Sequence, residues 1–224
     1  MSYFVTGTDT GVGKTLISCA LLHGFAAQGK RVVGMKPVAA GCNDDDMHED
    51  VRRLRAASNV LASKGQINPY CFSQAVAPHL AAQFAGVSIN LKRIAASYSE
   101  LSGQADVVIV EGAGGFLVPL NVRQDSADMV AELELPIILV VGMRLGCLNH
   151  ALLTVEAIAA RGLALAGWVA NGVDGQMAMP DENIAALRQR ITAPLLGVVP
   201  YQTQPDARAV AGLLDLKMLE QAVT

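Results

Sequence analysis

The sequence predicts an α/β fold in which a mostly parallel sheet is flanked by helices. Short apolar runs alternate with longer Ala-rich stretches, the pattern of strands joined by crossover helices. Hydrophobic residues make up 52% of the chain but aromatic residues only 4%, which is typical of a buried parallel sheet covered by Ala-rich helices. The chain has 224 residues and no linker rich in Pro, Gly or Ser, so we expect a single domain over residues 1–224.

The individual elements follow from these runs in chain order. We expect a strand over 3–7, a helix over 14–28 that ends at Gly29, and a second strand over 31–36. Later apolar runs predict strands at 106–111, 136–142, 165–171 and 195–199. Helices are expected between them at 49–62, 79–85, 91–102, 126–134, 149–161, 181–192 and 208–222. Typical helix-start residues precede or open three of these helices, at Asn90, Asp125 and Pro180. Exposed loops are expected at 41–50 and 174–180.

Charge and hydropathy argue against two classes of partner. A net charge of −3 and a pI near 5.8 provide no basic field for nucleic acid. The longest apolar run, residues 135–143, is about nine residues long, far short of the roughly twenty that cross a membrane. Strand residues begin at Tyr3, which leaves no room for a signal peptide, so we expect a cytoplasmic protein.

The four cysteines stand singly in the sequence, with no Cys-x-x-Cys pair: Cys19, Cys42, Cys71 and Cys147. This spacing argues against a zinc site and against a disulfide framework. We therefore expect all four to be reduced.

The first strand leads through a glycine-bearing loop, residues 7–15, into a helix. Such a loop is typical of phosphate binding, because its backbone N–H groups point inward and the helix N-terminus adds positive potential. Lys14 would supply a cation for the outer phosphates and Thr15 a hydroxyl for Mg²⁺. The role of Asp9 stays open, since it could hold a substrate amine or metal-bound water or could cap the loop backbone. The loop predicts a P-loop NTPase-like fold, although the five residues between Gly7 and Gly13 exceed the usual spacing.

Two acidic residues are candidates for Mg²⁺ ligands. Glu111 closes a strand and is followed by the small residues 112–115, so it could bind the ion opposite Thr15 or merely cap the next turn. Asp50 could add a third oxygen ligand or could be a first-turn acid of the following helix. The neighbouring acidic run 44–46 is expected to be a solvated loop.

Three further positions follow predicted strands, where ligand chemistry gathers in parallel sheets. Lys36 ends the second strand and is expected to be an active-site cation rather than a surface charge. Asn171 could read a nucleobase edge or form an Asn-Gly turn. The segment 146–150 opens a helix whose free N–H groups could hold a carboxylate, although His150 is expected to be a packed or capping residue.

Several motifs together resemble the dethiobiotin synthetase family of ATP-dependent cyclo-ligases. The matching segments occur in the family's order and span almost the whole chain: 5–15, 36–39, 68–70, 110–115, 146–151 and 167–171. The lengthened phosphate loop is a hallmark of that family. One position departs from the pattern, because many relatives carry serine where this chain has Ala40, which removes a hydroxyl contact to substrate.

The resemblance implies ATP and Mg²⁺ as cofactors and assigns residues to them. The implied ATP contacts are Gly11, Val12, Gly13, Lys14, Thr15, Leu16, Asp50, Glu111, Gly112, Ala113 and Gly114, with Asn171, Gly172, Pro200, Tyr201, Gln202 and Asp206 around adenine. The implied Mg²⁺ ligands are Thr15, Asp50 and Glu111, and the implied catalytic residues are Lys36 and Lys14. Substrate would contact Thr10, Lys36 and Ala40, and also Gly146, Cys147, Leu148 and Asn149 from the neighbouring subunit of a homodimer.

The implied reaction joins CO₂ to one amine of 7,8-diaminopelargonate as a carbamate, which ATP phosphorylates before the second amine closes a ureido ring. Two other classes compete with this interpretation. A switch ATPase that positions macromolecules would usually carry a second lysine early in the loop, where this chain has Thr6. A GTPase is distantly suggested by residues 171–174, which lack the lysine of the guanine motif.

Overall fold

The structure is a computed structural model, described here over residues 1–42 and 47–221. Its main sheet has six strands in the order β2-β5-β1-β6-β7-β8, and every neighbouring pair is parallel. The strands are β1 (Ser2–Gly7), β2 (Val32–Met35), β5 (Val107–Glu111), β6 (Ile137–Met143), β7 (Leu165–Gly172) and β8 (Leu195–Val199). The predicted fold class and all six predicted strands of this sheet are confirmed.

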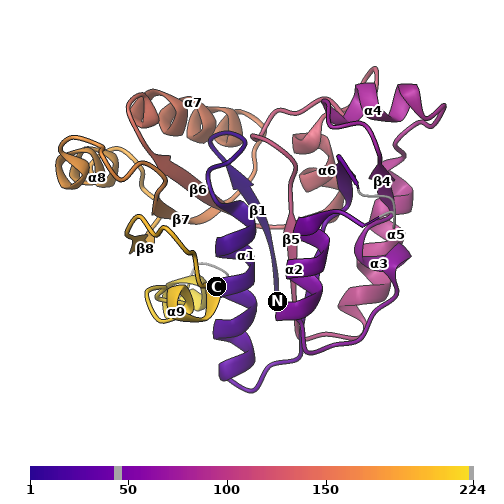
Figure 1. The fold of residues 1–224 in the computed structure, drawn as a ribbon, viewed down its shortest axis with the longest axis horizontal. Coiled ribbons are helices and arrows are strands. Elements are labelled where there is room, and N and C mark those ends of the chain that lie inside the picture. Colours follow the sequence, from indigo (N-terminus) through magenta and orange to yellow (C-terminus); the bar gives the residue numbers. More distant parts are fainter. Residues whose placement is uncertain (43–46, 222–224) are drawn as a thin grey trace.

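Helices cover both faces of the sheet and make a three-layer domain (Figure 1). One face carries α1 (Lys14–Ala27), α2 (Glu49–Ala57), α9 (Ala207–Ala211) and α10 (Lys217–Gln221). The other carries α3 (Lys64–Ile67), α5 (Leu91–Ser102), α6 (Ser126–Leu133), α7 (Cys147–Ala160) and α8 (Pro180–Arg188). No helix of the described chain is long and apolar enough to span a membrane.

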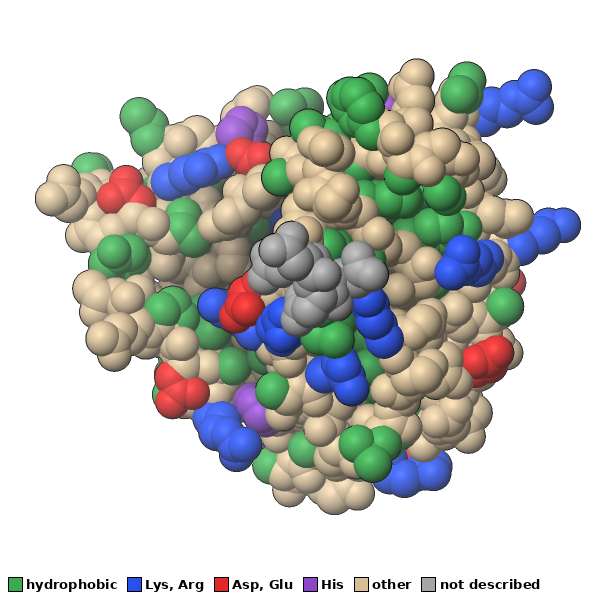
Figure 2. Space-filling view, turned by 45° about the vertical axis from the view of Figure 1, so that its right-hand side comes forward, with side chains coloured by type: hydrophobic (Ala, Val, Ile, Leu, Met, Phe, Trp, Pro, Cys, Tyr) green, Lys and Arg blue, Asp and Glu red, His purple; other side chains and the backbone are tan. Residues whose placement is uncertain are grey.

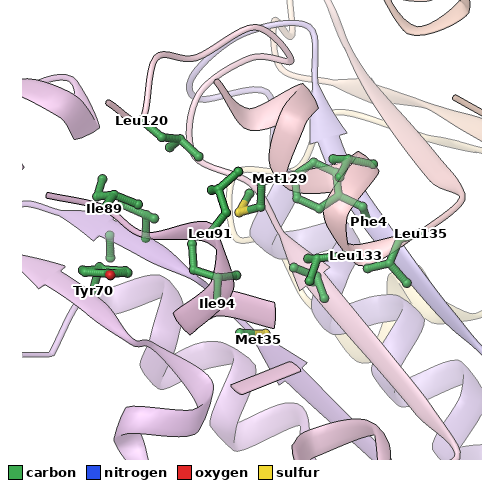
Figure 3. Packing of buried hydrophobic residues seen from close by; sticks show 14 of the residues in the cluster. Phe4, Met35, Tyr70, Ile89, Leu91, Ile94, Leu120, Met129, Leu133 and Leu135 are labelled. Carbon is green, nitrogen blue, oxygen red and sulfur yellow. The ribbon is translucent and has the colours of Figure 1, made fainter. Parts of the chain in front are cut away.

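Alternation along the strands divides the core between these two faces. Tyr3 and Val5 of β1 pack with α1, whereas Phe4 between them packs with the α5 and α6 side of the sheet. Figure 3 shows Phe4 among the residues that pack on the α5 and α6 side of the sheet. Met129, Leu133 and Leu135 lie near it, and Leu91, Ile94 and Met35 lie further along. Both faces of the sheet are therefore buried, which explains why its strands read as continuous apolar runs.

A second, two-stranded sheet lies beside the first and was not predicted. Its strands β3 (Val38–Ala40) and β4 (Tyr70–Phe72) pair in parallel, and α4 (Pro78–Phe84) packs against β3. The buried amide of Asn68 donates to the carbonyl oxygen of Lys36 at 2.6 Å and to that of Tyr70 at 3.0 Å. This side chain therefore ties the start of the small sheet to the end of β2.

The prediction that all four cysteines are reduced is wrong for one pair. Cys42 and Cys71 form a disulfide, with their Cα atoms 6.1 Å apart, while Cys19 and Cys147 are free and buried. The pairing follows from the register of the small sheet, in which Ala39 lies opposite Cys71. Sequence spacing could not reveal it, because the two cysteines are 29 residues apart.

Two predicted helices end earlier than expected, and a third is divided into two. The helix predicted at 49–62 ends at Ala57, and the helix predicted at 181–192 ends at Arg188. The tail predicted as one helix over 208–222 is divided into α9 and α10, because the backbone of Asp215 between them bonds to Leu196 of β8 at 2.8 Å. The predicted caps at Asn90 and Asp125 are confirmed, and Pro180 opens α8. The acidic run 44–46 lies outside the described residues.

Candidate active site

The carboxyl ends of the parallel strands open onto a cavity of about 980 Å³. It is lined by the phosphate loop and α1, by the ends of β2, β5 and β7, by β3, and by the segments 75–78 and 200–205. Figure 2 shows one side of the molecule. The surface there is hollowed near a group of Lys and Arg side chains. The expectation that loops after strands converge on one site is met by this arrangement.

The phosphate loop is held in shape by close contacts that only glycine permits. Gly13 has a φ of 90°, and a Cβ there would lie 2.2 Å from Nδ2 of Asn171. Val12 is buried against Gly142 of β6, where a Cβ would come within 2.7 Å of its side chain. The loop therefore packs directly on the ends of β6 and β7, with α1 starting at Lys14.

Lys14 points back over its own loop. Its Nζ donates to the carbonyl oxygen of Asp9 at 3.0 Å, and only 7% of the residue is exposed. Burial, with repulsion from Lys36, lowers the pKa of Lys14 from 10.5 to about 8. An anion bound beside it would oppose both effects, so the position suits a phosphate group.

Lys36 lies at the base of the cavity between two carboxylates. Its Nζ donates to Oε1 of Glu111 at 2.5 Å, to Oδ2 of Asp50 at 2.9 Å and to the carbonyl oxygen of Gly112 at 3.2 Å. Burial alone would lower the pKa of Lys36, but Glu111 and Asp50 outweigh burial and raise it. Lys36 is therefore a buried cation in the site, as the sequence suggested, and not a surface charge.

The residues predicted to bind Mg²⁺ meet at this point. The Thr15 hydroxyl donates to Oε1 of Glu111 at 2.9 Å, and Asp50 contacts the same lysine as Glu111. The other oxygen of Glu111, Oε2, is buried and has no hydrogen-bond partner among the described residues. Among the described residues, no cluster of three or more His, Cys, Asp or Glu side chains is arranged to hold a metal ion, so a site here needs the Thr15 hydroxyl as well. Two carboxylates and a hydroxyl fit Mg²⁺, which keeps waters and takes substrate phosphates as its other ligands.

Asp50 is a first-turn acid of α2, one of its two predicted alternatives, and it also lines the cavity. It lies in the first turn of α2, where His48 is the N-cap and its Nδ1 accepts from the Asp50 N–H at 3.1 Å. Burial would raise the pKa of Asp50, but Lys36 outweighs it and lowers that pKa. Both His48 and Arg53 of α2 line the cavity. Neither was predicted from the sequence, and His is not one of the usual N-cap residues.

Asn171 is committed to the phosphate loop in this structure. Its Nδ2 donates to the carbonyl oxygen of Val12 at 2.8 Å, and the residue is 3% exposed. Asn171 and Gly172 both belong to β7, so the alternative of an Asn-Gly turn is wrong. Gly172, Pro200, Tyr201 and Gln202 line one end of the cavity, whereas Asp206 caps α9 by accepting from Arg208 N–H at 2.9 Å.

The opposite end of the cavity is more apolar. The predicted substrate residues Thr10 and Ala40 line it, together with Val38, Val118 and the segment 75–78, which the sequence analysis missed. These small and apolar residues carry no chemical signature in sequence. They reach the site because β3 and β4 bring two distant segments together.

The segment 146–149 does not line this cavity. It begins α7, with Gly146 as the cap at a φ of 93°, Cys147 buried and Asn149 exposed. Two roles were left open for Asp9, and the structure bears on both. Its Oδ1 accepts from Thr10 N–H at 2.7 Å, and its Oδ2 pairs with Arg144. These contacts favour the loop-capping alternative for Asp9.

Comparisons with known proteins agree with a nucleotide site. A family model described as an AAA domain matches residues 1–209. The ATP-dependent dethiobiotin synthetase BioD of Nitrosospira multiformis is 58% identical over 214 residues, covering 96% of this chain and 94% of that protein. The protein of the same name from Aromatoleum aromaticum is 56% identical and covers 96% of this chain and 97% of that protein.

Solved structures with a similar fold are more distant. The septum site-determining protein MinD of Pyrococcus horikoshii, solved with Mg-ADP, has a TM-score of 0.56 at 16% identity, covering 97% of this chain and 89% of that one. The signal recognition particle receptor FtsY of Elizabethkingia anophelis has a TM-score of 0.53 at 16% identity, covering 100% of this chain and 65% of that one. At such identities the likeness concerns the fold alone.

Proposed function

Since this chain belongs to the dethiobiotin synthetase family and is an ATP-dependent ligase of biotin biosynthesis, we propose that it closes the ureido ring of dethiobiotin from 7,8-diaminopelargonate and CO₂. One amine adds to CO₂ and loses a proton, giving a carbamate. A carbamate oxygen attacks the γ-phosphorus of ATP, and ADP leaves. The second amine attacks the carbonyl carbon of this mixed anhydride, and phosphate leaves with loss of the amine proton.

The convergence of Lys14, Lys36, Thr15, Asp50 and Glu111 in one cavity is the observation that carries the proposal. Phosphoryl transfer depends on positioning and charge neutralisation more than on covalent help. Lys14 and the N–H groups at the start of α1 would hold the phosphates of ATP. Lys36 is the second cation and would neutralise charge where carbamate and γ-phosphate meet.

Thr15, Asp50 and Glu111 would hold Mg²⁺. The ion would supply charge neutralisation for the phosphates when bound. The unpartnered buried oxygen of Glu111 supports this assignment, because a buried carboxylate oxygen without a donor is otherwise costly. In the structure Lys36 pairs with the same two carboxylates.

The apolar end of the cavity supports an aliphatic substrate. Val38, Ala40, Val118 and the segment 75–78 offer small and apolar side chains beside Lys36. Ala40 provides no hydroxyl there, so the substrate amines would be held by backbone groups or water. At the other end, Gly172 and residues 200–202 support an adenine site next to the phosphate loop.

The decisive assay combines the purified protein with ATP, Mg²⁺, bicarbonate and diaminopelargonate. We expect dethiobiotin, ADP and phosphate in equal amounts, and no ATP hydrolysis when diaminopelargonate is left out. A chain that hydrolyses ATP equally well without diaminopelargonate would instead be a switch ATPase. If no dethiobiotin forms, the proposal is wrong.

We further propose a homodimer in which the segment 146–149 of each subunit completes the other subunit's site. The segment opens a helix of 14 residues and lies outside the cavity of its own subunit, which supports this arrangement. Two inactive variants, Lys36→Gln and Asn149→Asp, would then complement each other. The second places a negative charge where the substrate carboxylate would bind. Mixing them with subunit exchange is expected to restore about a quarter of the wild-type activity, since half of the dimers would hold one intact site. Absence of any recovery in a verified heterodimer would contradict a shared site.

A further inference from the structure

An acidic residue of the phosphate loop is paired with a basic residue of another loop. Asp9 accepts a hydrogen bond from Thr10 N–H through Oδ1, and its Oδ2 contacts Nη2 of Arg144. Arg144 lies between the end of β6 at Met143 and the start of α7 at Cys147. The two side chains are half exposed, at 49% for Asp9 and 41% for Arg144.

The negative charge of Asp9 lies in a loop that is proposed to bind anionic phosphates. Its carbonyl oxygen accepts from Lys14 Nζ at 3.0 Å, and its carboxylate acts electrostatically on the same lysine. Phosphates held by Lys14 would therefore bind within range of the Asp9 carboxylate, and two like charges repel each other. Protonation does not relieve this repulsion, because the Thr10 hydrogen bond and the Arg144 contacts hold the pKa of Asp9 below its usual value.

We propose that Arg144 is a positioning residue for the nucleotide, whose guanidinium neutralises Asp9 so that the phosphate loop can accept anionic phosphates. This role rests on the proposed ATP site and extends it to a residue that does not line the cavity. Arg144 acts through Asp9 and makes no contact with the nucleotide itself.

The loop has other attachments to β6 that do not depend on this pair. Thr8 N–H donates to the carbonyl oxygen of Val140 at 3.0 Å, and Gly142 N–H donates to the Thr8 hydroxyl at 3.4 Å. Loss of the Arg144 side chain therefore leaves the loop backbone tied to the sheet. The main change is an unpaired carboxylate beside the phosphates.

Calorimetric titration of ATP, with Mg²⁺ at low ionic strength, tests the proposal through affinity rather than turnover. Arg144→Gln is expected to raise the Kd for ATP about tenfold, and by less in about 0.5 M NaCl, because salt screens the exposed carboxylate. Asp9→Asn alone is expected not to weaken binding. The double variant Asp9→Asn/Arg144→Gln is expected to recover an affinity within about twofold of the wild type, since it removes both charges. Arg144→Lys should retain most of the wild-type affinity.

A matched control is the pair of Arg31 and Asp106. These residues lie at the amino ends of the strands, directly before β2 and β5. Their side chains are 2.8 Å apart and 62% and 40% exposed, so Arg31→Gln also leaves an aspartate unpaired and is expected to leave the Kd unchanged. If the double variant binds ATP as weakly as Arg144→Gln, then Arg144 contacts the nucleotide directly and the inference is overturned. If the wild type binds ATP and Arg144→Gln binds it equally well, the inference alone fails. A wild type that binds no ATP would overturn the proposed function together with the inference.

Discussion

Lys36 lies between two carboxylates, and this pairing determines what can replace it. The residue is 4% exposed, and Glu111 beside it is fully buried. A buried carboxylate that loses its cation is left uncompensated, which is more costly than the loss of an exposed ion pair. Lys36 therefore compensates the charge of both carboxylates, whatever its part in the reaction.

Lys36→Gln is expected to lower kcat at least about 100-fold while changing the Kd for ATP less than about threefold. In the proposed site Lys14 and the loop would hold the phosphates, so the loss of Lys36 would fall on the phosphoryl-transfer step. Steady-state kinetics and calorimetric titration measure the two effects separately. Lys92→Gln, which removes an exposed lysine of α5, is the matched control. Unchanged turnover in Lys36→Gln would contradict the catalytic assignment.

Glu111→Gln is expected to raise the Mg²⁺ concentration needed for half-maximal activity about tenfold or more, together with a lower maximal rate. The amide keeps the shape of the side chain but loses the charge that a divalent cation requires. A Mg²⁺ titration of the reaction rate measures both effects. Glu49→Gln removes an exposed glutamate next to Asp50, one that pairs with Arg53, and serves as the control. A normal Mg²⁺ titration in Glu111→Gln would exclude Glu111 as a ligand.

Sequence reasoning found four charged residues of the cavity but missed Arg53, and it missed most of the apolar wall. Lys14, Lys36, Asp50 and Glu111 carry chemistry and follow predicted strands or begin helices, so their convergence could be anticipated. The segment 75–78 has neither charge nor periodicity, and its place depends on contacts between distant parts of the chain. Such residues are visible only once the fold is known.

The short strands β3 and β4 could not be predicted from local sequence patterns. Each has three residues, which is too short for an alternating pattern to distinguish a strand from a loop. Their pairing is supported by Asn68 and by the disulfide between Cys42 and Cys71. The wall of the cavity thus depends on the least predictable elements of the chain.

Reduction of this disulfide is expected to lower the Tm by roughly 10 °C. Closing a loop of 29 residues restricts the unfolded chain by about 3.5 kcal/mol, and each kcal/mol is worth about 2–4 °C in a chain of this size. Thermal unfolding followed by circular dichroism, with and without reductant, measures the shift. The double variant Cys42→Ser/Cys71→Ser should not respond to reductant. Titration of the unreduced protein in denaturant should find only the thiols of Cys19 and Cys147, and four free thiols would contradict the bond.

The fold was predictable because each strand of the main sheet is an apolar run, and all of them except the edge strand β8 are almost wholly buried. The C-terminal tail was predicted less well, because a tertiary contact of Asp215 with β8 interrupts a stretch whose local pattern is helical. The helix ends at Ala57 and Arg188 were also misplaced, because the local sequence pattern defines the end of a helix less sharply than its interior. The order of the strands in the sheet was not predicted.

Alkaline pH is expected to weaken the domain through Cys19. Burial raises the pKa of the Cys19 thiol from 9.0 to about 12. Above pH 9 the unfolded chain loses this proton while the folded chain keeps it, so the free energy of unfolding falls as pH rises from 9 towards 12. The slope from this group is up to about 1.4 kcal/mol per pH unit. Urea unfolding of wild type and Cys19→Ala at several pH values isolates the effect. Parallel pH profiles for the two proteins would contradict it.

The strand order has a consequence for how the chain reaches its fold. β1 lies at the centre of the sheet, where Phe4 is paired with Val110 of β5 on one side and with Ile137 of β6 on the other. Because β1 precedes both of these strands in the chain, it has no sheet partner until β5 and β6 have been synthesised. Closing such long loops is entropically costly and slows folding. The phosphate loop, which joins β1 to α1, is thus expected to acquire its shape late, although it precedes β5 and β6 in the chain.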